Sequence, residues 1–76
     1  MANLAELDAR LLAAHASRDQ VALVGLYAQA ADGCEAMGDI QAACFYLTHA
    51  YVFALDEGDG RAAALHARLK AQGREE

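Results

Sequence analysis

The stretch VGLYAQAADGCEAMGDIQAACFYLTHAYVFALDE, Val24 to Glu57, contains two long apolar segments on either side of Gly38 and Asp39. Glycine tends to interrupt a helix, and aspartate is a preferred first residue because its carboxylate accepts hydrogen bonds from the free backbone N–H groups. The stretch therefore predicts two antiparallel helices joined by a short turn.

The same signals recur along the chain. Asp19, Asp39 and Asp59 each precede an alanine-bearing segment, and Asn3 stands in the equivalent place near the beginning. Aspartate is also favoured there by the positive end of the helix dipole. The predicted helices cover residues 4–16, 20–37, 40–56 and 60–73. With connections of only two to four residues, sequence neighbours should be antiparallel, within one domain covering 1–76.

Composition also favours an all-α fold. The 76 residues include twenty alanines and ten leucines but only three valines and one isoleucine, with no proline or tryptophan. Alanine and leucine lose the least on entering a helix. The 57% hydrophobic content excludes a disordered segment. A chain this short buries about 60% of its unfolded surface, so its core must be efficient or shared with a partner.

Charge and cysteine content exclude several classes of function. Eleven acids oppose six bases, a net charge of −5, so nucleic-acid binding is not expected. No apolar run reaches the roughly 20 residues that span a bilayer, so no membrane role is expected. Cys34 and Cys44 lie among apolar residues and form no metal motif. With an acidic rather than basic N-terminal region, we expect a cytoplasmic protein with reduced thiols.

Periodicity predicts which helix faces are buried. The last helix has an apolar face of Ala62, Leu65 and Leu69, which leaves its basic residues on a solvated face. The second helix carries an apolar stripe that ends at Met37. The helix at 40–56 is apolar almost all round, which is typical of a helix buried on every side. Either the other three helices enclose it, or part of it packs on a second copy of the chain.

Two architectures satisfy these observations, an up-down four-helix bundle and a set of stacked helical hairpins. Val24–Glu57 resembles a tetratricopeptide repeat, a 34-residue antiparallel helix pair. The resemblance rests on the Gly38-Asp39 turn and on small, aromatic and large apolar residues at the repeat's positions, namely Tyr27, Ala31, Ala43, Leu47 and Ala50. The chain departs from the repeat at Ala30, Cys34 and Leu55.

The resemblance implies one full repeat with a half repeat on each side. Such repeats bury their faces against neighbours and usually need about three copies, so we expect a homodimer formed through residues 40–56. Members of the family bind extended peptides on the face lined by first helices. The matching residues here are Asp32, Glu35, His66 and Lys70. The acidic pair favours a basic peptide as the protein partner.

Four of the five aromatic residues fall between Phe45 and Phe53. Aromatic side chains are enriched where interfaces carry most of their binding energy. Tyr51 points away from the others on a helix, so we expect it to be exposed or to face a second copy. Tyr51 and Phe53 are the predicted self-association residues.

Catalysis is not expected. Ser17, with His15 and Asp19 nearby, lies in a turn that provides no oxyanion hole, and Ser17 and Asp19 fit ordinary capping chemistry. No cofactor is expected either. The alternative hypothesis is a ligand- or metal-binding helical bundle that uses His49, Tyr46 and Cys44, a convergence that sequence alone does not show.

Overall fold

The computed structural model describes residues 4–73, which form four helices and no strand. The helices are α1 (Leu4–Ser17), α2 (Gln20–Ala36), α3 (Ile40–Glu57) and α4 (Arg61–Ala71). The all-α prediction is confirmed, and the predicted helix ends agree with these bounds to within two residues. The predicted cap Asn3 lies outside the described residues.

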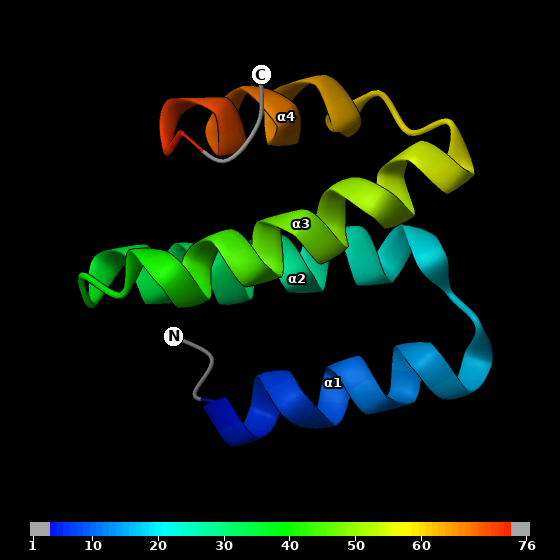
Figure 1. Cartoon of the computed structure of the whole chain (residues 1–76). Helices are drawn as coiled ribbons and strands as arrows, with labels where there is room; N and C mark the ends of the chain where they lie inside the picture. Colours follow the sequence, from blue (N-terminus) through cyan, green and yellow to red (C-terminus); the bar gives the residue numbers. More distant parts are fainter. Residues whose placement is uncertain (1–3, 74–76) are drawn as a thin grey trace.

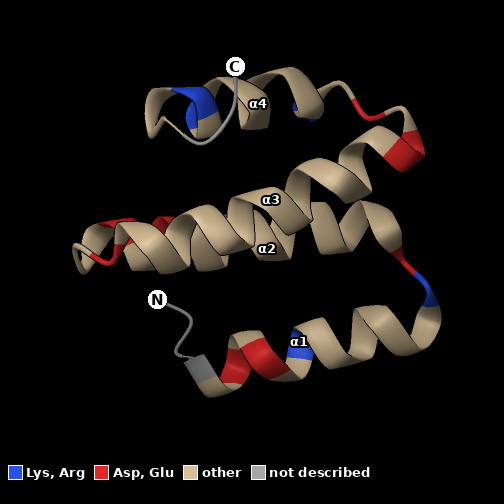
Figure 2. Cartoon of the chain, in the orientation of Figure 1, with Lys and Arg blue, Asp and Glu red and all other residues tan. Residues whose placement is uncertain are grey.

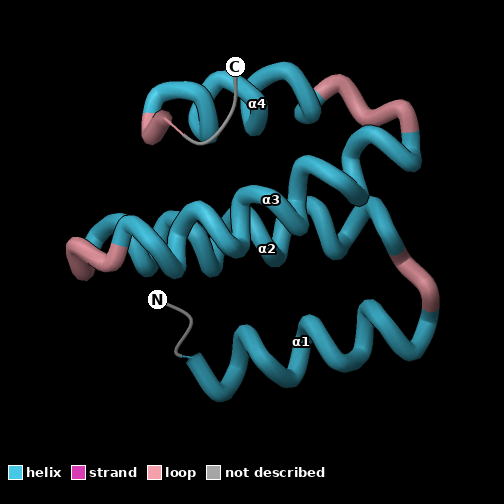
Figure 3. The backbone as a smooth tube through the Cα atoms, viewed as in Figure 1, coloured by secondary structure: helices cyan, strands magenta, loops and turns pink. Residues whose placement is uncertain are grey.

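The helices are arranged in an open row. The α2–α3 hairpin is central, with α1 packed on α2 and α4 packed on α3 (Figure 1). The turns between successive helices are short (Figure 3). Within residues 4–73, α1 and α4 make no contact with each other, whereas a closed four-helix bundle would bring them together. The molecule is consequently a flat slab of 32 × 30 × 16 Å.

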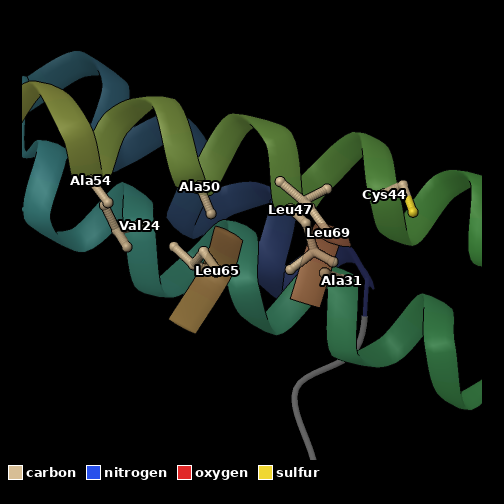
Figure 4. Packing of buried hydrophobic residues seen from close by; sticks show 8 residues of the cluster. All are labelled: Val24, Ala31, Cys44, Leu47, Ala50, Ala54, Leu65 and Leu69. Atoms are coloured by element: carbon tan, nitrogen blue, oxygen red, sulfur yellow. The ribbon is translucent and has the colours of Figure 1, made fainter. Parts of the chain in front are cut away.

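The main core lies where α2, α3 and α4 meet (Figure 4). Ala31 of α2 and Ala50 and Ala54 of α3 are completely buried, so the two helices approach closely. Leu47 and Leu69, also completely buried, fill the space beside them. The cluster consists of Val24, Ala31, Cys44, Leu47, Ala50, Ala54, Leu65 and Leu69. Small residues at the helix contact and leucines around it form one continuous core.

Helix α1 is attached separately. Among its described side chains, Leu7 and Ala14 are buried, and α2 contributes Leu23 and Ala30, which are buried outside the main cluster. The predicted apolar stripe of α2 is wrong at its end, because Met37 follows the last residue of the helix and is 81% exposed.

Aspartate caps two helices as predicted. The Asp19 and Asp39 carboxylates accept hydrogen bonds from the backbone N–H groups of Ala22 and Ala42, both at 3.1 Å. At α4 the prediction is wrong by one residue, because Gly60 occupies the cap position and makes no side-chain hydrogen bond.

Asp59 instead forms hydrogen bonds and an ion pair with Arg61. Its Oδ1 accepts the Arg61 backbone N–H at 2.9 Å, and its Oδ2 accepts from Arg61 Nη2 at 2.6 Å. The Arg61 side chain, followed by this backbone hydrogen bond, lowers the pKa of the Asp59 carboxyl from 3.8 to about 2. The same guanidinium donates from Nη2 to the Val21 carbonyl at 3.0 Å, so it connects the beginning of α4 to α2.

Leu47→Ala should lower the free energy of unfolding by about 3 kcal/mol, because it opens a cavity beside residues with no exposed surface. Leu55→Ala is the matched control on the same helix, since Leu55 is 55% exposed. It should change the free energy by less than about 0.5 kcal/mol. Urea unfolding of dilute protein, followed by circular dichroism, measures both. Equal effects would contradict the position of Leu47 in the core.

Asp59 should give stability a defined pH dependence. Its folded pKa of about 2 lies below the ordinary 3.8, so the ionised carboxylate stabilises the fold above about pH 4. This contribution is lost as the pH falls towards about 2. The Tm of the unaltered protein should therefore exceed that of Asp59→Asn at pH 6, with the gap closing between about pH 4 and 2. A gap independent of pH would contradict the ion pair.

Candidate interaction surface

One face of α3 is exposed along nearly the whole helix. Its members recur at alternating intervals of four and three residues, which places them on one side of the helix. They are Gln41, Phe45, Thr48, Val52 and Leu55, called here the α3 stripe, and all five are exposed. The exposed fractions of Phe45, Val52 and Leu55 are 59%, 49% and 55%. Three of the five are large apolar residues, so the stripe exposes apolar surface over most of its length.

The flat arrangement of helices leaves this face uncovered. The buried residues of α3, such as Ala43, Leu47 and Ala54, lie on its side towards α2 and α4. The opposite side has no neighbouring helix among the described residues. Of the two alternatives that the sequence left open, enclosure of this helix by the other three is therefore wrong.

The α3 stripe is also electrically neutral. Figure 2 shows that α3 has no charged residue until Asp56 and Glu57 at its end. The Thr48 hydroxyl, in the middle of the stripe, donates to the Cys44 carbonyl at 2.8 Å. This bond satisfies the hydroxyl within the helix, so its burial against another surface costs less than that of a free hydroxyl. The stripe can lose its water without leaving a charge unpaired.

A shallow depression of about 270 Å³ lies on the first half of the stripe, lined by Gln41, Cys44, Phe45 and Thr48. Cys44 is only 4% exposed there. A second hollow, of about 460 Å³, lies between α1 and α2 over a surface that includes three alanines, with Arg10 and Gln29 among its polar residues. Of these two hollows, only the first belongs to the exposed apolar face of α3.

The predicted self-association residues are half-buried within the chain. The Tyr51 ring stacks on His66 of α4, with the ring centroids 5.4 Å apart. The Phe53 ring stacks on Tyr27 at 5.8 Å and meets His15 edge-on at 6.1 Å. The rings of Tyr51 and Phe53 therefore connect helices of the same chain, and their part in self-association stays a prediction.

Tyr27 is the centre of an aromatic cluster that joins α1, α2 and α3. Its ring lies 5.2 Å from His49 and 6.1 Å from Tyr46. Its hydroxyl lies 3.0 Å from His15 Nε2, within hydrogen-bonding distance. Burial, with a smaller effect of Tyr46, raises the pKa of Tyr27. The cluster is packed ring against ring, and it attaches α1 to the central hairpin.

The predicted acidic partner site is occupied by the chain's own arginine. Arg68 Nη2 donates to Asp32 Oδ1 at 2.7 Å and to Glu35 Oε1 at 2.5 Å. Burial lowers the pKa of Arg68, but the hydrogen bonds to Glu35 and Asp32 outweigh it, and the net pKa is raised. The prediction that Arg68 lies on a solvated face is therefore wrong. Of the other predicted partner residues, His66 stacks on Tyr51 and Lys70 is exposed.

The residues of the metal hypothesis do not form a donor cluster. Cys44 belongs to the main core, whereas the His49 ring contacts Tyr27 and Phe45. Residues 4–73 contain no group of three or more histidine, cysteine or acidic side chains placed to hold a metal ion. Cys34 and Cys44 are free thiols, and burial, followed by the nearby Asp39, raises the pKa of Cys34.

The sequence drew attention to the helix at 40–56 but did not indicate which of its sides is exposed. The missed signal is the spacing of Gln41 and Thr48, the polar residues that share one face with Phe45, Val52 and Leu55. A polar residue on an otherwise apolar helix tends to mark the solvent side. Those two positions, read at helical spacing, would have separated the outer face from the core.

Comparisons with protein-family models, curated proteins and solved structures found no match. Among the described residues, no helix has the length and apolar character needed to cross a membrane.

Arg68→Ala should reduce the free energy of unfolding by about 1 kcal/mol, because it leaves two neighbouring carboxylates without their cation. Lys70→Ala, two residues away on the exposed side of α4, is the matched control and should have less than half this effect. Urea unfolding measures both variants. The difference between them should shrink in 1 M salt, which screens partly exposed charges. A difference unchanged by salt would point to lost packing instead.

Proposed function

We propose that the chain is a small non-catalytic protein–protein interaction module that associates with itself through the α3 stripe. The observation that carries the proposal is the exposure of Phe45, Val52 and Leu55 on one uncharged helix face. The rest of the chain carries a net charge of −5. Two identical copies therefore repel each other least where they meet along this neutral face.

The size of the stripe sets the strength of the association. From Gln41 to Leu55 it extends about 21 Å along the helix, and at a width of about 10 Å it offers roughly 200 Å² per copy. A standard stable interface uses about 800 Å² per partner. Burying both stripes gives at most about 10 kcal/mol, which the cost of association, about 4–15 kcal/mol, largely offsets. We therefore expect a weak, reversible dimer that dissociates on dilution.

Local geometry supports a non-catalytic role. Ser17 Oγ donates to the Ala14 carbonyl at 3.3 Å, as a capping residue does. The nearby His15 is directed to the Tyr27 hydroxyl. The serine, histidine and aspartate of this turn are thus engaged in structural contacts rather than with one another.

The tetratricopeptide-like pattern supports a role in association, because such repeats are interaction scaffolds. A basic peptide bound between α2 and α4 would compete with Arg68 for Asp32 and Glu35. This competition favours the α3 stripe over the acidic pair as the interaction site. We place the protein in a reducing compartment such as the cytoplasm, where Cys34 and Cys44 remain free thiols.

Light scattering on a sizing column over a dilution series tests the proposal. The mass of the unaltered protein should rise towards twice the chain mass of 8.0 kDa as concentration increases. Val52→Glu should shift this rise to at least tenfold higher concentration, because each copy then places an unpaired carboxylate in the uncharged contact.

Val21→Glu is the matched control. It makes the same substitution at a residue of α2 that is 54% exposed but lies off the stripe. Its dilution curve should match that of the unaltered protein. An unaltered chain that stays monomeric at every concentration would refute self-association, and equal effects of the two substitutions would refute the stripe as the contact.

A further inference from the structure

We infer that two copies pair along the α3 stripe with their helices antiparallel, around a two-fold axis close to residue 50. In this arrangement Phe45 faces Leu55 of the second copy, and Thr48 faces its Val52. The inference rests on the proposed self-association and specifies its geometry.

The residue spacing of the stripe favours packing against another helix. Intervals that alternate between four and three residues, as from Phe45 to Thr48, Val52 and Leu55, generate the seam along which two helices interlock side chains. A two-fold axis makes both partners use the same surface patch, which a stripe on a single helix provides. The same stripe on a second copy therefore has the residue spacing needed to pack against it.

The order of residues along the stripe selects the register. With the axis near residue 50, the two most exposed apolar side chains of the stripe, Phe45 and Leu55, meet at both ends of the contact. The satisfied hydroxyl of Thr48 then lies against Val52. Gln41 falls beyond the end of the paired segment, where water can reach its amide. An axis near residue 46 or 47 would instead place Gln41 against Val52 and bury that amide without a partner.

Charge selects the orientation. Asp56, next to Leu55 at the end of the stripe, would lie close to its counterpart in a parallel pair, and the two helix dipoles would point the same way. In the antiparallel pair the two acidic ends are separated by about 13 residues of helix, or about 20 Å. That separation exceeds the Debye length of about 8 Å at physiological salt, so the repulsion is screened.

Cysteine cross-linking tests the orientation. Cys34→Ser and Cys44→Ala first remove the native thiols, and circular dichroism with light scattering must show that this background folds and associates. Phe45→Cys and Leu55→Cys are then made separately in it, and one of them is labelled with ¹⁵N. The two proteins are mixed in equal amounts, oxidised at a concentration where association is measured, and analysed by mass spectrometry.

The antiparallel pair predicts that disulfides joining position 45 to position 55 greatly exceed the half expected from random pairing. Val21→Cys in the same background is the off-stripe control and should cross-link little with either protein. Same-position disulfides in excess would overturn the antiparallel geometry and leave self-association through the stripe intact. If light scattering shows a dimer but no disulfide forms between stripe positions, both the antiparallel geometry and the stripe as the contact surface would be overturned. The absence of any dimer would overturn the proposed function itself.

Discussion

The structure depends on the close approach of α2 and α3 through alanine. Ala31, Ala50 and Ala54 are completely buried, and no larger side chain could take their place without separating the helices. This contact builds the central hairpin, and the core continues from it to Leu65 and Leu69 of α4. Helix α1 depends on the same hairpin, since its His15 contacts Tyr27 of α2 and Phe53 of α3.

The flatness of the molecule follows from this arrangement and leads to the candidate site. Helices added to the two sides of one hairpin form a layer, here 16 Å in its smallest dimension, rather than a closed bundle. In a layer, a helix that is apolar on every side keeps one face open. That helix is α3, and its open face holds Phe45, Val52 and Leu55. This apolar surface is therefore exposed because the helices form a flat layer. We propose that it serves self-association.

Part of the candidate site could be predicted from the sequence. The apolar circumference of residues 40–56 left two alternatives open, enclosure by the other three helices or contact with a second copy. The choice of Tyr51 and Phe53 rested on the clustering of aromatic residues, but both rings stack on side chains of the same chain. Arg68 was likewise expected in solvent, yet it pairs with two carboxylates more than thirty positions earlier in the chain. Such distant pairings depend on where α4 lies, which helical spacing does not encode.

Local chemistry by itself determined the four helices. Alanine-rich segments favour helix, and aspartates such as Asp19 and Asp39 cap them through hydrogen bonds that extend only three residues. Only the tertiary structure decided which sides of those helices meet. The order in which they pack determined that α1 and α4 lie on opposite sides of the hairpin, that Arg68 is paired, and that one side of α3 is exposed. The physical reason is that burial is a property of the whole assembly of helices, whereas helix formation and capping are settled within a few neighbouring residues.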